Sequence, residues 1–130
     1  MFAAKKDDQV IAVDTHIVMV PSPGGPVPTP MPMPYSGKLV QGLCTSVKVE
    51  DQPAATDGSI AINDPPHAPA GGPFQKPPDN KATIVKPSGT VLFEDKPAAR
   101  MGDTAETCND PAPAPVGTVV VAGGTVRIGG

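Results

Sequence analysis

One stretch of the sequence occurs twice, and this internal repeat limits the possible folds more than any other feature. Residues 47–56 and 91–100 share the pattern Val-x-apolar-Glu-Asp-x-Pro-Ala-Ala, 44 residues apart. A third, shortened copy closes the chain at 124–130, where Gly-Thr-Val-Arg-Ile-Gly-Gly matches the residues that follow Ser88. Because repeats at a fixed spacing indicate similar units that pack on one another, we predict a single domain over 1–130. Its three related units would cover approximately 10–60, 61–104 and 105–130.

Each unit contains a short run in which apolar and other side chains alternate. Such alternation predicts short strands, and we expect turns after them that begin at Asp51, Asp95 and Gly129. No window places apolar residues at helical spacing, so we expect an all-β fold in which only 105–109 could form a turn of helix. The apolar face of the strands would form a thin core or continue into a partner; it comprises Val47, Val49, Val91, Phe93, Val126 and Ile128.

Proline is concentrated between the predicted strands. The chain has 19 prolines and 14 glycines in 130 residues, close to the composition of disordered chains. The prolines gather at 21–34, 65–78 and 111–115, where fixed φ angles favour stiff, extended backbone. Since these tracts recur in step with the strands, we interpret them as long rigid loops inside one domain rather than as linkers.

The remaining composition excludes several classes of protein. Three Phe, one Tyr and no Trp cannot supply the core of a large enzyme. The net charge of −3 is scattered along the chain, which argues against nucleic acid or an anionic membrane surface as a partner. We see no signal peptide, and no apolar stretch approaches the ~20 residues that span a bilayer, so we expect a chain that is made in the cytoplasm.

Four residues of the types that bind transition metals are present: His16, Cys44, His67 and Cys108. His16, His67 and Cys108 fall at comparable places in the three units, so a pseudo-threefold arrangement would bring them together at one end. Cys44 would complete the four ligands of a closed zinc site, and bound metal would offset the thin core. Two alternatives stay open, namely ordinary buried side chains and a disulfide between Cys44 and Cys108.

The second copy of the repeat resembles a known family. Residues 93–103, followed by Cys108, are similar to the PAAR family, which is named for the tetrapeptide found here as Pro97-Ala98-Ala99-Arg100. The first copy carries the related Pro53-Ala54-Ala55-Thr56, and Asp14-Thr15-His16 resembles the family's opening histidine segment. With the terminal Gly-Thr-Val-Arg-Ile-Gly-Gly, the resemblance extends over nearly the whole chain.

This resemblance implies a small conical β-structure that caps the trimeric β-helical spike of a contractile injection system. Such systems include type VI secretion machines and phage-tail-like particles. One tip would sit on each VgrG-like trimer, with or without an effector, and would help to pierce the target membrane while contacting it only transiently. The family binds Zn²⁺ near the apex through His and Cys, which carries over to His16, His67 and Cys108, with Cys44 completing the set. The tip would assemble in the cytoplasm and leave with the particle.

Two departures from the family pattern leave the subtype open. Thr56 replaces the arginine of the motif, and Glu-Asp occupies 50–51 and 94–95, where Asn-Gly is common. Arg100 is expected to pair with a nearby carboxylate, either Asp95 or Asp103. We expect no fused toxin domain.

Two other functions compete with a structural, non-enzymatic tip. A zinc-dependent hydrolase would need an open metal position and a general base, for which Glu106 is the one candidate. A disordered proline-rich adaptor would bind aromatic grooves through segments such as 26–30. The adaptor explains the composition but leaves the repeats without a role.

Overall fold

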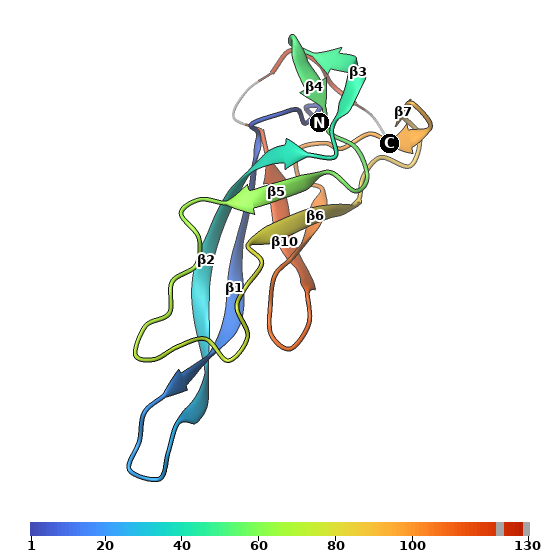
Figure 1. Cartoon of the computed structure of the whole chain (residues 1–130). Coiled ribbons are helices and arrows are strands. Elements are labelled where there is room, and N and C mark those ends of the chain that lie inside the picture. Colours follow the sequence, from blue (N-terminus) through green and yellow to red (C-terminus); the bar gives the residue numbers. More distant parts are fainter. Residues whose placement is uncertain (122–123, 129–130) are drawn as a thin grey trace.

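The computed structural model describes residues 1–121 and 124–128, and the expected all-β fold is confirmed (Figure 1). No described residue is helical, so none belongs to a helix that could cross a membrane. The turn of helix considered for 105–109 is wrong, because most of this segment is strand. The strands are β1 (Gln9–Val20), β2 (Val27–Gln41), β3 (Cys44–Val49), β4 (Gln52–Ala54), β5 (Ile60–Asn63), β6 (Lys81–Lys86), β7 (Leu92–Phe93), β8 (Lys96–Pro97), β9 (Thr104–Thr107) and β10 (Ala114–Val120).

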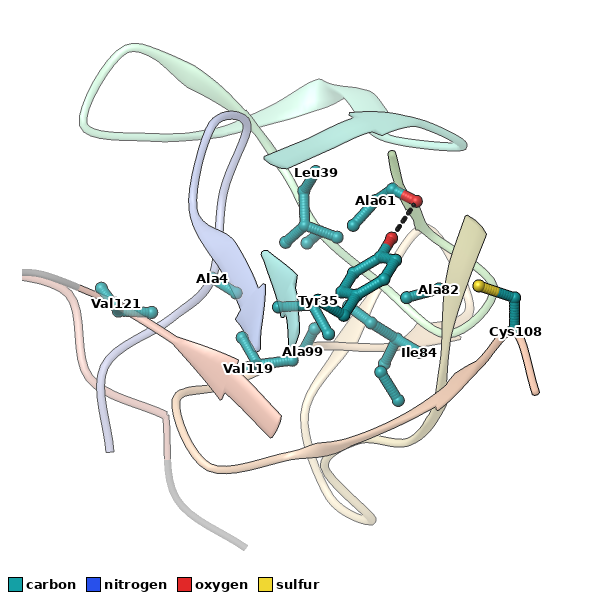
Figure 2. Packing of buried hydrophobic residues seen from close by; sticks show 13 residues of the cluster. Ala4, Tyr35, Leu39, Ala61, Ala82, Ile84, Ala99, Cys108, Val119 and Val121 are labelled. Atoms are coloured by element: carbon teal, nitrogen blue, oxygen red, sulfur yellow. Dashed lines mark hydrogen bonds between the residues drawn. The ribbon is translucent and has the colours of Figure 1, made fainter. Parts of the chain in front are cut away.

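Six of the strands close into an antiparallel barrel in the order β1-β10-β9-β6-β5-β2. Its interior is narrow, because alanines supply much of the wall and Tyr35 is the largest fully buried side chain (Figure 2). The Tyr35 hydroxyl donates a hydrogen bond of 2.9 Å to the carbonyl oxygen of Ala61. Since closure removes free sheet edges, a barrel is one way to stabilise a chain with so little apolar bulk.

Two short hairpins, β3–β4 and β7–β8, stand with the N-terminal residues and residues 124–128 at one end of the barrel, which we term the base (Figure 1). The first two predicted turns form one residue earlier than expected, at Glu50 and Glu94. Both residues of each turn have positive φ: 51° and 67° at Glu50 and Asp51, and 52° and 66° at Glu94 and Asp95. Two consecutive left-handed residues are typical of the hairpin turn that favours Asn-Gly. The third predicted turn, at Gly129, lies outside the described residues.

The unusual glutamates of these turns connect neighbouring units. Glu94 accepts hydrogen bonds from Ser46 and Cys44, and Glu50 accepts two from the backbone and side chain of Thr125. Ser46 and Thr125 stand at equivalent positions, one residue before the first valine of their strands. Each turn carboxylate therefore ties its hairpin to the unit beside it, which gives a structural reason for Glu where a short side chain is usual.

The two Pro-Ala-Ala segments meet an Ala-Ala segment from the N-terminus in the interior of the molecule. The Ala4 N–H donates to the Ala99 carbonyl at 2.9 Å, Ala99 to Ala55 at 3.0 Å, and Ala55 to Ala4 at 3.0 Å. These three fully buried residues form a closed cycle that we call the alanine ring. Its third member comes from Phe2-Ala3-Ala4-Lys5, which lies outside the three units expected from the sequence; the unit boundaries themselves stay a prediction.

The backbone after each ring alanine follows the same course in all three segments. The next residue donates its N–H to a side chain three positions further on, at 2.9, 2.9 and 2.6 Å for the pairs Lys5–Asp8, Thr56–Ser59 and Arg100–Asp103. Two of the pairs are also salt bridges, at 3.1 Å for Lys5 and 2.8 Å for Arg100. Of the two partners expected for Arg100, Asp103 is confirmed.

The two ends of the chain together build the third hairpin position. Phe2 pairs with Arg127, the Ala3 N–H donates to the Val126 carbonyl at 2.9 Å, and the Ile128 N–H donates to Met1 at 2.8 Å. In the second unit the corresponding bond joins Ala98 to Val91. The third unit is thus split between the N-terminal and C-terminal segments.

Five of the six apolar residues expected on the strand faces contribute to a core that these hairpins share. Val49 and Ile128 are buried in a second core with Ala3, Ala54 and Ala98, and Val47, Val91 and Phe93 pack against it. Val126 is 38% exposed. This second core continues the threefold pattern of the alanine ring towards the base.

The first proline tract is not a loop beyond residue 26, which corrects the sequence-based expectation. Pro28, Pro30, Pro32 and Pro34 lie on β2, paired with β1 along its whole length. Their partners Met19, Ile17 and Thr15 direct their N–H groups to the other side of β1, towards Pro73, Asp110 and Asn109. The prolines therefore occupy positions where β2 needs no N–H, because β5 covers this edge only at Gly37–Gln41.

We predict that Ala99→Leu lowers the free energy of unfolding by about 2 kcal/mol, because extra methylene groups cannot enter the close-packed ring without displacing its backbones. Urea denaturation measures this change. Ala112→Leu, in an exposed loop, is the matched control and should have almost no effect. Equal stability of the two variants would contradict a structural role for the ring.

Candidate metal centre

Four side chains with metal-binding atoms gather beside the barrel: Asp14, His16, His67 and Cys108. One donor atom from each lies within 4.8 Å of the others. Asp14 and His16 are two residues apart on β1, so both point to the same face of the strand. His67 comes from the β5–β6 connection, and Cys108 directly follows β9. Three distant segments are therefore brought to one point.

Asp14 lies at the centre of the group. Its Oδ2 atom is 2.9 Å from His67 Nε2 and 3.3 Å from Cys108 Sγ. Its Oδ1 atom accepts a hydrogen bond from the Thr107 hydroxyl, and the whole side chain is inaccessible to solvent. A buried carboxylate in contact with an imidazole and a thiol places the donor atoms for a cation within one small volume.

His16 has both ring nitrogens buried without a hydrogen-bond partner among the described residues. The nearest acidic group is Asp110, whose Oδ2 is 3.6 Å from Nδ1. Burial, and then the neighbouring His67, lower the pKa of His16, so its imidazole is neutral at pH 7. Since buried polar atoms are rarely left unpaired, a neutral imidazole with free nitrogens is what a metal site would require here.

Cys108 supplies a thiol that is 7% exposed. Burial, followed by the charge of Asp14, raises its pKa to about 12, so the thiol stays protonated without a cation. A bound cation would favour the thiolate instead. One thiolate and one carboxylate would then balance a divalent ion, and two imidazoles would complete a set of four N, S and O donors suited to tetrahedral coordination.

His67 is oriented by two asparagines. Its backbone N–H donates to Asn80 Oδ1 at 2.8 Å, and its Nδ1 lies 3.3 Å from Asn63 Nδ2. Asn63 thus holds the nitrogen that faces away from Asp14, which leaves Nε2 directed into the group. Partners of this kind fix the ring orientation and tautomer of metal-binding histidines.

The structure brings together three of the four residues expected as ligands and places Cys44 elsewhere. Cys44 lies in the second core near the base, where its Sγ is 3.3 Å from Glu94 Oε2. Both cysteines are free thiols, so the structure does not contain the disulfide that was left open. Asp14 takes the fourth place in the group. Its spacing of two residues from His16 is the one signal in the sequence, and it gains meaning only because this segment proves to be the strand β1.

The cavities around the group differ in size. The one that borders His16 and Cys108 measures about 70 Å³, below the few hundred Å³ of typical small-molecule pockets, whereas an open groove beside His67 measures about 350 Å³. Glu106, the one base considered for a hydrolase, is exposed on β9 and is not in the group. The four side chains therefore meet without that base beside them.

A family model described as PAAR motif matches residues 19–111, which is more than two thirds of the chain. The match includes both copies of the tetrapeptide region, and it begins after Asp14, His16 and the N-terminal Phe2-Ala3-Ala4-Lys5. No curated protein matches the chain.

We predict that Cys108→Ser loses most of its bound transition metal, because the thiolate is the strongest donor of the group. Cys44→Ser is the matched control and should keep about one ion per chain. Elemental analysis gives the metal content, and cobalt-substituted protein should show a thiolate-to-metal absorption band in Cys44→Ser only. Loss of metal from both variants would restore the ligand set expected from the sequence.

Metal binding near pH 7 should release about one proton per chain from Cys108, because the pKa of its thiol is raised to about 12 in the metal-free protein. Affinity should therefore increase with pH. Calorimetric titration in buffers with different ionisation enthalpies counts the protons. Release of the same number by Cys108→Ser would contradict thiolate ligation.

Proposed function

The chain belongs to the PAAR motif family, and from this premise we propose that it caps and sharpens the trimeric spike of a contractile injection system. Its role is structural rather than catalytic. The observation that carries the proposal is the alanine ring, because it gives one chain an approximate threefold axis. A single copy can then continue the true threefold axis of a trimer, with one tip on each spike.

The base is the end that we propose to contact the spike. It presents the β3–β4 hairpin, the β7–β8 hairpin and the paired segments 1–3 and 126–128 at three equivalent positions (Figure 1). Three apolar side chains are exposed among them: Met1 at 56%, Leu92 at 56% and Val126 at 38%. The outer edges of these hairpins would add to the edges of the spike sheets, so that backbone hydrogen bonds join the two proteins.

We propose that the metal is a structural Zn²⁺ held by Asp14, His16, His67 and Cys108. Two imidazoles, a thiolate and a carboxylate are ligands that zinc accepts in tetrahedral geometry. The ion would join β1 to the connections that follow β5 and β9. It would thus stiffen the half of the molecule that faces away from the base, as a point under load requires.

The proposal also covers where the protein acts. The tip would join its spike in the cytoplasm and leave the cell at the front of the particle, with or without an effector. Contraction would drive it into the target membrane. A VgrG-like spike is the partner that the family suggests. The identity of that spike would determine which type of particle the tip belongs to.

The adaptor alternative receives no support from the fold. Residues 26–30, which would have to be free to bind an aromatic groove, lie at the start of β2, where Val27 to Pro30 are paired with β1. A segment already used in a sheet is not available as a free polyproline ligand.

We expect the chain to co-purify with the spike trimer of the same machine in a ratio of one to three, as measured by native mass spectrometry. Leu92→Glu should weaken this complex at least tenfold, because it places a charge in an apolar contact. Val27→Glu is the matched control, since Val27 is similarly exposed at the far end of the molecule. A complex unaffected by Leu92→Glu but lost in Val27→Glu would reverse the proposed orientation.

A further inference from the structure

The hairpin of β1 and β2 extends well beyond the barrel, away from the base (Figure 1). We call residues 12–36 the apical hairpin. From residue 17 to residue 37 the sequence contains no Asp, Glu, Lys, Arg or His, although 23 of the 130 residues carry formal charge. The two acidic or basic side chains nearer the barrel, Asp14 and His16, are buried. The far half of this hairpin is therefore uncharged.

Its few polar side chains are bonded within the hairpin itself. The Ser22 hydroxyl donates to the carbonyl of Gly25, and the Thr29 hydroxyl donates to that of Val27 at 3.1 Å. These are the two hydroxyl side chains between Ile17 and Pro34. Neither donor would be left unpaired if the hairpin moved out of water.

The backbone of the apical hairpin likewise exposes few donors. The open edge of β2 has proline at residues 28, 30, 32 and 34, where an N–H would otherwise point into solvent. The turn adds Pro21, Pro23 and Pro26. On the β1 side, the N–H groups of Thr15, Ile17 and Met19 are bonded to neighbouring loops.

The surroundings of the apical hairpin share this character. Residues 68–74 and 111–116 consist of proline, alanine and glycine with one Phe and one Val, and contain no charge. Phe74 bridges to Val18, so the first of these loops lies against β1. Exposed apolar side chains continue along the hairpin at Val13 (63%) and Val27 (48%).

We propose that the apical hairpin binds lipid bilayers by inserting its uncharged end into the hydrocarbon region. This inference rests on the proposed tip function and adds to it, because a point driven by force alone needs no affinity for lipid. In a bilayer, each charge and each unpaired backbone polar group carries a large penalty. The end of the hairpin beyond His16 has no charge, and its prolines remove the N–H donors of the open edge, so that only carbonyl oxygens remain unpaired there. From Met19 to the turn, the hairpin has about five residues on each strand. At roughly 3.3 Å per residue, this end would reach about 15 Å into the bilayer, which is half of a ~30 Å hydrocarbon core.

Proline on a sheet edge also prevents the edge from pairing with another chain, and this protective role must be distinguished from lipid binding. Edges are usually protected by charged residues, lysine above all, and the edge of the apical hairpin has none. Edge protection also gives no reason for the internal hydrogen bonds of Ser22 and Thr29, or for the uncharged loops at 68–74 and 111–116. Compatibility with lipid accounts for the uncharged edge, the bonded hydroxyls and the uncharged loops.

The absence of tryptophan from the chain allows a direct test. Val27→Trp places a fluorescent reporter on the apical hairpin, and Leu92→Trp places a matched one at the base. With neutral phosphatidylcholine vesicles, the emission of the first variant should shift to the blue and be quenched by lipids brominated on their acyl chains. The emission of the second should not change. Quenching of neither reporter, or of both equally, would overturn the proposal.

A charged variant provides the second arm of the test. Pro23→Glu with Pro26→Glu, introduced into Val27→Trp, should reduce vesicle binding at least tenfold, because two carboxylates must then enter the bilayer. Both prolines are in the exposed turn, and an unchanged thermal midpoint verifies that the fold is intact. Unchanged vesicle binding would refute insertion. Spike binding measured on the same variants separates this inference from the tip function, which would survive its failure.

Discussion

The alanine ring is the constraint on which the rest of the architecture depends. Three backbone segments approach closely enough to exchange hydrogen bonds in a cycle, and only small side chains permit that approach. Ala4, Ala55 and Ala99 are each completely buried. The ring converts a chain poor in apolar residues into a closed structure, because it satisfies three central N–H groups and fixes three units about one axis. The tetrapeptide that marks the family is thus chiefly a packing device, in which proline and alanine matter through shape.

The sequence predicts this repeated architecture where the copies share identical residues. The first and second copies were evident because Glu-Asp-x-Pro-Ala-Ala recurs at one spacing. The copy at Phe2-Ala3-Ala4-Lys5 escaped notice because Phe replaces proline and because its strand partner lies at the opposite end of the chain. A unit that is split between the two ends of the chain has no continuous sequence pattern by which it could be predicted. Only the hydrogen bonds that close the alanine ring reveal the third unit.

The candidate metal-binding residues show a similar limit. Residue type and position relative to the repeat predict His16, His67 and Cys108, whereas only the need for a fourth ligand points to Cys44. The structure instead supplies Asp14, which a count of His and Cys overlooks. The strand within the proline tract at 21–34 is hard to predict for another reason. Proline is usually rare in strands, and only the one-sided pairing of β2 makes alternate prolines acceptable there.

The position of the metal group explains how the apical hairpin can extend so far from a thin core. β1 pairs with β10 only as far as Ile11, and β2 pairs with β5 only from Gly37 onward, so the hairpin beyond them has two strands. An isolated two-stranded hairpin is marginally stable in water. The group stands at Asp14 and His16, immediately past the point where barrel pairing ends. A cation bound there would attach β1 to the two connections that flank it, and would thereby carry the rigidity of the barrel into the hairpin. Along β1, barrel pairing thus ends at Ile11, the candidate metal group follows at Asp14 and His16, and contacts with the neighbouring loops continue to Met19.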